Sequence, residues 1–224
     1  MLIISYYGLI YCVLLLTLLR KNFSMSDIRK HIENAPDGKV FFISDFSNMN
    51  ISEKSVSRAL YAAVERGTII RLANGIYLRP KRTAFGIAYP SVDELIVKIA
   101  KHDKAKVMPC GDNALNILGL STQVPTNYTY LTTGSSRRLT IGNRHITLKR
   151  RVPRNFAFKT KLGALLTQAL KTLGKNNVGK QELAQIQALI KKEKNIEAVK
   201  EDIKLMPIWI RNTVLNTIKH SGQG

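Results

Sequence analysis

The chain has 224 residues and a formal net charge of +20, from 35 Lys and Arg against 15 Asp and Glu. This length allows one large domain or two small ones, and the 45% hydrophobic content excludes a wholly disordered chain. So large a positive charge predicts a polyanionic partner: DNA, RNA or an acidic membrane surface. The two cysteines, Cys12 and Cys110, are too few for a disulfide framework and suit a reducing cytosol.

Residues 1–24 stand apart as an apolar segment. Residues 2–19 carry no charge, and Arg20 and Lys21 follow at once. One interpretation is an N-terminal membrane anchor, because the run is long enough to span a bilayer and the basic pair would hold the rest of the chain in the cytoplasm. The other is a misassigned start, with translation beginning at Met25 on a helix that Ser26 can cap. We favour the second interpretation and expect a cytoplasmic protein.

Residues 25–82 follow the element order of a winged helix-turn-helix domain. A short helix, a tight turn and a second helix with polar residues near its start form the helix-turn-helix pattern. Asn48 and Asn50 suit the tight turn. The predicted elements are a helix over 26–35, a turn at 36–38, a strand over 40–43, a brief helix over 46–49 capped by Ser44 or Asp45, and a helix over 52–66.

The helix over 52–66 is the predicted recognition helix, because Ser52 is a good N-cap and Gly67 a good C-terminal stop. The following stretch has two β-prone runs around Asn74-Gly75, which predicts a hairpin in the position of a wing. Such a helix reads base edges and such a wing holds phosphates, although helix-turn-helix units also serve as protein-interaction modules. The side chains expected to contact DNA are Lys54, Ser55, Ser57, Arg58, Tyr61, Arg71, Asn74 and Arg79.

After a predicted linker over 83–90, residues 91–224 form a second predicted domain. Ser91 and Glu94 make a capping box that begins a helix through 101, and Asp112 can cap another helix through 118. Strands are expected over 106–108, 128–132, 138–141 and 145–149, and helices over 161–173, 181–193 and from Pro207 onward. The expected fold class is α+β: an N-terminal winged helix-turn-helix followed by a mixed α/β domain that ends in helices.

The charge is concentrated in this second domain. Residues 113–181 contain no Asp or Glu and twelve Lys and Arg residues. A solvated surface normally mixes both signs, so the acid-free stretch indicates a surface for phosphates or for an acidic partner. Strand alternation prevents these side chains from all projecting from one face. The expected basic surface comprises Arg137, Arg138, Arg144, Lys149, Arg150, Arg151 and Arg154.

The sequence shows no catalytic motif, so we expect no enzymatic activity, no bound metal and no cofactor. The acid-free middle supplies no paired carboxylates, and no phosphate-binding loop or dinucleotide fingerprint occurs. The four histidines are scattered and lack cysteine pairs beside them, which argues against structural zinc. Cys110 with His102 upstream is better explained as a buried cysteine than as a nucleophile.

Three stretches carry a family resemblance. They read GTIIRLANGIYLRP at 67–80, PCGDNALNILGLSTQVPTNYTYLTTG at 109–134 and RRLTIGNRHITLKRRVPR at 137–154. Over about residues 26–220 the chain resembles the AbiEi antitoxins of bacterial type IV toxin–antitoxin and abortive-infection systems. The segments GLSTQVP and YLTTG are the more specific part, since many regulators share the wing.

The resemblance implies a winged helix that binds repeats in its own operon's promoter and represses it. It also implies a C-terminal domain that acts against a nucleotidyltransferase-like toxin, by direct contact or otherwise. By position, 52–66 would be the DNA-contacting helix and 71–79 the wing. Two alternatives stay open: a membrane-anchored winged-helix regulator that uses residues 2–19, and an RNA-binding protein.

Overall fold

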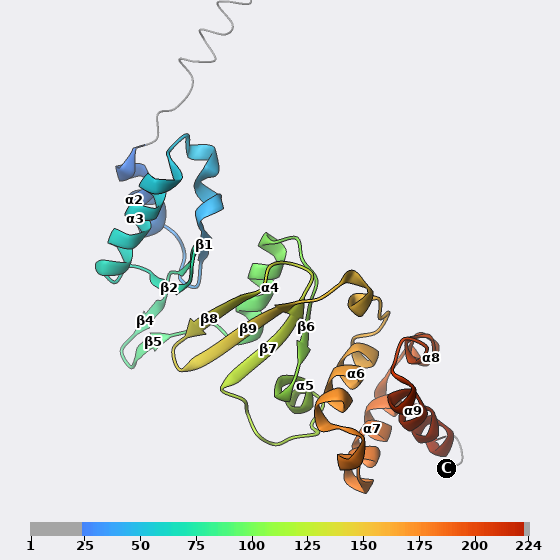
Figure 1. Cartoon of the computed structure of the whole chain (residues 1–224). Helices are drawn as coiled ribbons and strands as arrows, with labels where there is room; N and C mark the ends of the chain where they lie inside the picture. The colour runs from blue at the N-terminus through green and yellow to red at the C-terminus, as the bar shows by residue number, and fades with distance from the viewer. Residues whose placement is uncertain (1–23, 222–224) are drawn as a thin grey trace, which may run out of the picture. The chain divides into compact units, whose positions relative to one another are not determined.

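A computed structural model describes residues 24–221 of the chain (Figure 1). The apolar run predicted over 2–19 therefore lies outside the described residues. The chain divides into two compact units that meet at Tyr89 and Pro90. We call them the N-terminal unit and the C-terminal unit. Across residues 24–221, no helix is long and apolar enough to cross a membrane. The α+β fold class predicted from the sequence is confirmed.

The N-terminal unit packs two helices against a small antiparallel sheet whose strand order is β1-β3-β2. Ile28 and Ile32 of α2 meet Val56 and Leu60 of α3 in its core. The apolar spacing of both helices is the cause, because it turns one side of each toward the sheet. The elements are α2 (Met25–Glu33), β1 (Val40–Phe42), η1 (Ile43–Met49), α3 (Glu53–Glu65), β2 (Ile70–Ala73), β3 (Ile76–Leu78), β4 (Lys81–Thr83) and β5 (Gly86–Ala88).

The brief helix predicted over 46–49 begins earlier and has a tighter form. It is the 3₁₀ helix η1, which starts at Ile43. Asp45 does not precede this helix as a cap; it lies inside the first turn, where its Oδ2 accepts the Phe42 N–H at 2.9 Å. Asn50 ends the turn in the left-handed conformation with φ of 55°, which asparagine tolerates better than most residues. The turn between η1 and α3 is thereby kept short.

The segment predicted as a linker over 83–90 contains strand structure. Lys81–Thr83 pairs antiparallel with Gly86–Ala88 as β4 and β5, with Lys81 opposite Ala88. Thr83 Oγ1 donates to the Gly86 carbonyl at 2.9 Å. Gly86 has φ of 115°, which strains any residue with a side chain. The polar composition concealed this hairpin, because both strands are fully exposed and show no apolar alternation.

The C-terminal unit is built on a mixed sheet with the strand order β6-β7-β9-β8. The central pair β7 and β9 is parallel, and the two outer pairs are antiparallel. Figure 1 shows α4 crossing one face of this sheet. The elements are α4 (Val92–His102), β6 (Val107–Cys110), α5 (Asp112–Ile117), β7 (Asn127–Thr132), β8 (Arg137–Ile141) and β9 (Arg144–Arg150).

The helix α5 is not capped by Asp112. Its N-cap position is Gly111, with φ of 67°, and Asp112 is the first helical residue. A residue with φ in this range is most often glycine, so the tight passage from β6 into α5 explains Gly111. The capping box at Ser91 and Glu94 is present as predicted: each backbone N–H of the pair donates to the other's side chain.

Each face of the sheet has its own cover. The face we call the α4 face includes Leu139, Ile146 and Leu148, all buried. Tyr130, also on this face, donates its hydroxyl to Asp93 of α4 at 2.7 Å. Burial raises the pKa of Tyr130 above its ordinary value, and the bond to Asp93 adds to the rise. The opposite face, the α6 face, is covered only where Met108, Cys110 and Leu131 pack against Phe156 and Ala164.

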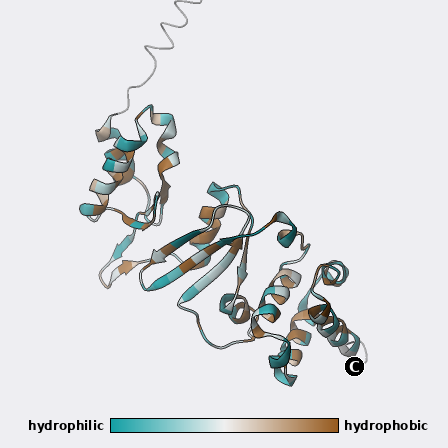
Figure 2. Cartoon of the chain, in the orientation of Figure 1, coloured by the Kyte–Doolittle hydropathy of each residue, from teal (hydrophilic) through white to brown (hydrophobic). Residues whose placement is uncertain are grey.

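The chain ends in a layer of helices that shares one core with α5. Leu115 and Leu118 pack with Leu166, Ile186 and other buried side chains of this layer. The helices carry hydrophobic and hydrophilic positions in alternation around their axes (Figure 2), as helices with one buried side do. The elements are η2 (Pro153–Phe156), α6 (Lys161–Leu173), η3 (Lys175–Asn177), α7 (Lys180–Lys192), α8 (Ile196–Ile203) and α9 (Ile208–Ser221).

Candidate nucleic-acid interface

Helix α3 presents one polar side to solvent. Its buried side carries Val56, Ala59, Leu60 and Ala63, which hold the helix to the core. Helical spacing then leaves one stripe exposed on the other side. The stripe consists of Lys54, Arg58, Tyr61 and Glu65. Tyr61 is 61% exposed, which is high for an aromatic side chain. Two cations and an exposed aromatic ring along the first turns suit contact with DNA.

The predicted contacts Ser55 and Ser57 differ from these residues in their surroundings. The Ser52 Oγ accepts the Ser55 N–H at 3.2 Å, which caps the helix. The Ser55 Oγ lies 2.9 Å from the Ser52 Oγ and so belongs to the same cap. Ser57 is only partly exposed, between the buried and the exposed sides. Arg58 is therefore the stronger candidate for reading a base edge.

The wing forms where Asn74-Gly75 predicted it. Strands β2 and β3 are paired antiparallel, with a register shift between Arg71 and Ala73. Gly75 has φ of 72°, which the turn requires. The Arg71 guanidinium lies along the turn, where one nitrogen donates to the Asn74 Oδ1 at 3.0 Å. Both side chains are exposed, so the wing offers a cation whose direction is fixed by its own turn.

The side chain of Arg79, predicted to contact DNA, is bonded to groups of the N-terminal unit instead. Its guanidinium donates to the carbonyls of Ile32 and Glu33, the last residues of α2. It also lies 3.6 Å from the Asp37 carboxylate, and its side chain is 24% exposed. Helices leave their last carbonyls without partners, and a cation there satisfies them. Arg79 thus closes the C-terminus of α2, and Arg82 donates to the carbonyl of Gly67, just beyond the C-cap of α3.

We expect Arg79→Ala to lower the free energy of unfolding by about 1–2 kcal/mol, because two helix-end carbonyls and Asp37 lose their donor. Chemical denaturation of the full chain measures the change. Arg71→Ala is the control, since its side chain is exposed and bonds only its own turn. Equal stability of Arg79→Ala and Arg71→Ala would contradict the structural role.

The β4–β5 hairpin adds residues that sequence reasoning missed. Phe85 is fully exposed at its turn, and Ile87 and Tyr89 are also exposed. Lys81 lies exposed on the first strand. Isolated apolar side chains on a surface are ordinary, but an exposed aromatic ring beside cations is a common feature of nucleic-acid contacts. The dipeptide Phe85-Gly86 was the one available signal, because glycine at this position marks a turn.

The uncovered half of the α6 face carries the densest charge. On β8 and β9, Arg138, His145 and Lys149 point to this side, with Thr140 and Thr147 between them. Arg138 is paired with Thr147 and Thr140 with His145, so the side chains form adjoining rows. All of the cations on this half are exposed. We call Arg138, His145 and Lys149 the basic sheet face; Arg144, Arg150, Arg151 and Arg154 lie exposed at the ends of β9 and beyond it.

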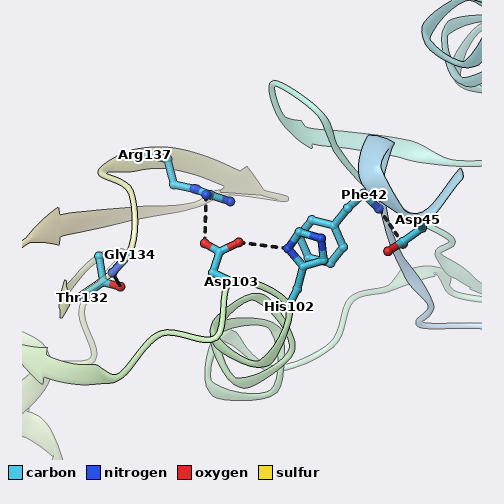
Figure 3. Close-up of polar contacts among 7 residues, drawn as sticks. All are labelled: Phe42, Asp45, His102, Asp103, Thr132, Gly134 and Arg137. Carbon is cyan, nitrogen blue, oxygen red and sulfur yellow. Dashed lines mark hydrogen bonds and ion pairs between the residues drawn. The ribbon is translucent and has the colours of Figure 1, made fainter. Parts of the chain in front are cut away.

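Arg137 does not belong to this surface. It lies opposite Leu148 and so on the α4 face of the sheet. Its guanidinium is 2.9 Å from Asp103, whose carboxylate also meets the His102 ring at 2.9 Å. Figure 3 shows Asp103 between these two side chains. The sequence placed Arg137 beside Arg138 but strand alternation separates them, and Asp103, the partner, is distant in sequence.

Within the described ranges, no group of three or more His, Cys, Asp and Glu side chains is arranged to hold a metal ion. The acidic residues near the sheet have structural partners: Asp93 accepts from Tyr130, Glu94 from Ser91, and Asp103 from Arg137. Cys110 is buried on the α6 face, and this burial raises the pKa of its thiol, while Lys149 and Arg151 oppose the rise. A raised pKa disfavours the thiolate that nucleophilic catalysis needs.

Comparisons with known proteins give a family and a fold likeness. A family model described as "Family of unknown function (DUF6088)" matches residues 27–198. Among solved structures, the chain is similar to the crystal structure of the RV2827C protein from Mycobacterium tuberculosis, with 11% identity and a TM-score of 0.48. That alignment covers 87% of this chain and 75% of the other. No curated protein matches the chain.

Proposed function

The chain belongs to the DUF6088 family, whose function is unknown, and from its own residues we propose that it is a sequence-specific DNA-binding autorepressor that also acts as an antitoxin. The observation that carries the DNA-binding part is the exposed stripe of α3, with Arg58 at its centre and the wing directly after the helix. The antitoxin part rests on the resemblance of residues 67–80, 109–134 and 137–154 to the AbiEi family. No catalytic step is part of the proposal.

The positions of the charges indicate which residues would read bases and which would contact phosphates. Arg58 and Tyr61 extend from a helix of 13 residues, which the major groove of duplex DNA can admit. Arg71 on the wing supplies contact to a phosphate at the flank. These few cations give direction and register, but they supply little of the affinity that a polyanion normally gains from counterion release. The basic sheet face is the larger source of charge.

The basic sheet face supports binding in a manner that does not depend on sequence. Arg138 and Lys149 have no carboxylate on the same strands to neutralise them, because residues 113–181 lack Asp and Glu. Cations that face solvent without an acidic partner attract phosphates at long range. An acidic surface on a protein toxin would be attracted by the same charges. The proposal assigns phosphate contacts to this face and leaves base reading to α3.

The substitution Arg58→Ala tests the recognition helix. We expect it to lower discrimination between promoter DNA and scrambled DNA by about 1–3 kcal/mol, the typical value of a bidentate arginine–guanine contact. The measurement is a gel-shift titration at fixed salt with DNA from upstream of the gene and with a scrambled duplex of equal length. The ratio of the two dissociation constants is the quantity of interest.

Arg66→Ala is the matched control, since Arg66 is an exposed arginine at the C-terminal end of the same helix. It removes the same charge, so any electrostatic loss should fall equally on both duplexes and leave the ratio unchanged. If Arg58→Ala preserves the ratio, the assignment of α3 as the recognition helix is wrong.

RNA binding is a second candidate, and one observation favours it: the basic sheet face is an open sheet surface, a form on which single-stranded RNA commonly lies. Competition separates the two. If single-stranded or duplex RNA displaces promoter DNA at equal concentration, RNA is the better ligand. If only promoter DNA competes, the DNA-binding proposal holds.

A further inference from the structure

Besides the basic sheet face, the C-terminal unit has a second cluster of basic side chains, which lines a hollow in its surface. The hollow has a volume of about 510 Å³ and is bounded by η2, the middle of α6 and the connection from α8 to α9. Four cations line it: Arg154, Lys171, Lys204 and Arg211. No Asp or Glu is among the lining residues. This volume is within the range of about 300–1,000 Å³ that is typical of small-molecule sites.

Arg211 is the fixed element of the hollow. One of its terminal nitrogens donates to the carbonyls of Lys204 and Met206, at 2.8 Å and 3.4 Å. These bonds hold the guanidinium at the wall. Its Nε is buried and has no hydrogen-bond partner. A buried donor without a partner is costly, and the two bonds of the terminal nitrogen keep the side chain in this position nonetheless.

Among the described residues, the cations of the hollow make no direct ion pair with an acid, although Lys204 lies close enough to Glu201 to help lower the pKa of that carboxyl. The nearby Glu201 is paired with Lys159 instead. Like charges gathered around one hollow repel each other, and an anion with several charges relieves this repulsion. Gln168, which is 9% exposed, adds a nearly buried amide to the lining.

The rest of the lining is apolar. Phe158, Leu205, Met206 and Pro207 contribute to the wall of the same hollow. Apolar and aromatic walls with a few convergent polar groups are typical of sites for organic ligands, and an aromatic ring can contact a base or a ribose. Inorganic phosphate would use the cations but not this wall. The combination therefore favours a phosphate chain attached to a nucleoside.

We propose that this hollow binds a nucleotide with two or three phosphates, with Arg211 and Lys171 on the phosphates and the wall around Phe158 and Met206 on the nucleoside. The ligand chemistry has two sources, a free nucleoside triphosphate or the 5′-triphosphate end of an RNA. The site goes beyond the proposed DNA-binding function: it shares Arg154 with the basic surface, and none of its lining residues belongs to the N-terminal unit.

The test is a binding titration of the full chain at about 0.15 M salt, where loose surface charge is screened. The probes are ATP, GTP, adenosine and inorganic triphosphate, each followed by thermal shift and calorimetry. We expect ATP or GTP to bind more tightly than adenosine and inorganic triphosphate. We expect Lys171→Gln and Lys204→Gln, both at exposed residues, each to weaken binding about tenfold, the value of one charge-assisted contact.

Lys191→Gln is the matched control, because Lys191 is an exposed lysine on α7 that is not part of the lining. Arg211→Gln is a further variant, read only if its far-ultraviolet spectrum shows a folded chain. The proposal is overturned if no triphosphate binds, or if Lys191→Gln weakens binding as much as Lys171→Gln. A 5′-triphosphorylated RNA is compared with ATP and with the same RNA carrying a 5′-hydroxyl. If the triphosphorylated RNA binds more tightly than both, the phosphates of the natural ligand belong to an RNA end. We expect Lys171→Gln and Lys204→Gln to bind promoter DNA as tightly as the parent chain does. This measurement separates the nucleotide site from the proposed repressor function.

Discussion

Asp202→Ala is expected to lower the free energy of unfolding of the C-terminal unit by about 3–5 kcal/mol, which is at the upper end of single substitutions. Asp202 is fully buried on α8, yet it does not pair with a cation. Its carboxylate accepts the backbone N–H groups of Lys159 and Thr160 at 2.6 and 2.8 Å, and the Thr160 hydroxyl at 2.6 Å. Alanine would leave these partly buried donors without their acceptor and would remove a carboxylate from a fully buried position.

The same carboxylate also explains a glycine. A Cβ on Gly163 would lie 2.6 Å from the Asp202 Oδ2 and 2.8 Å from its Cβ, closer than real contacts. Gly163→Ala should therefore force α6 and α8 apart and destabilise the unit in the same direction. Urea denaturation followed by the fluorescence of Trp209 measures both variants. Trp209, the single tryptophan of the chain, packs against the core shared by α6 and α8.

Glu201→Ala is the matched control, because it removes a neighbouring carboxylate that is exposed and paired only with Lys159 at the surface. Surface ion pairs contribute about 0–1 kcal/mol, so this variant should unfold close to the parent chain. A loss of similar size for Glu201→Ala and Asp202→Ala would show that burial of the carboxylate is not what matters.

The double variant Arg138→Glu/Lys149→Glu is expected to weaken binding of promoter DNA roughly a hundredfold or more at physiological salt. Both side chains lie on the basic sheet face, so reversal replaces attraction to phosphates with repulsion. We also expect the slope of log affinity against log salt to become shallower by about two phosphate contacts. Gel shifts over a salt series give both quantities.

The double variant Lys191→Glu/Lys192→Glu is the control, since it makes the same change in net charge at exposed positions of α7. A general effect of charge would lower affinity equally in both proteins, and this outcome would remove the basic sheet face from the proposal. The ratio of promoter to scrambled DNA should stay constant in both, because α3 is untouched.

Much of the fold follows from local patterns. Ser52 with Gly67 bounds α3, Asn74-Gly75 sets the wing, and Ser91 with Glu94 begins α4, each because backbone groups are satisfied within a few residues. Local patterns were less accurate for the helix start at Asp112, for η1 and for the β4–β5 hairpin, and they gave no sign of α8. The 3₁₀ helix η1 begins earlier than the sequence predicts. The sequence predicts a linker where the β4–β5 hairpin lies, because nothing apolar marks its polar strands.

The candidate site was predicted less completely, and the reason is physical. The sequence shows which side chains are charged, but a charge is available to DNA only if no neighbour uses it. Arg79 and Arg137 were expected at the surface, and both are engaged by groups distant in sequence: the end of α2 and Asp103. Arg58 and Lys149 are exposed, and neither takes part in an ion pair within residues 24–221. The sequence does not indicate the exposure of Phe85, because that exposure depends on a hairpin whose strands carry no apolar alternation.

By itself the sequence determined that this is an α+β protein with a helix-turn-helix, a wing and an acid-free basic region, because composition, caps and turns act over short distances. Only the tertiary structure decided which cations are free. Pairing of β8 with β9 brings Arg138 and Lys149 to one uncovered face, and the packing of α9 against α6 and α8 gathers Lys171, Lys204 and Arg211 around a hollow. Whether a charge attracts a polyanion depends on its neighbours in space, and these neighbours come from parts of the chain that the sequence keeps apart.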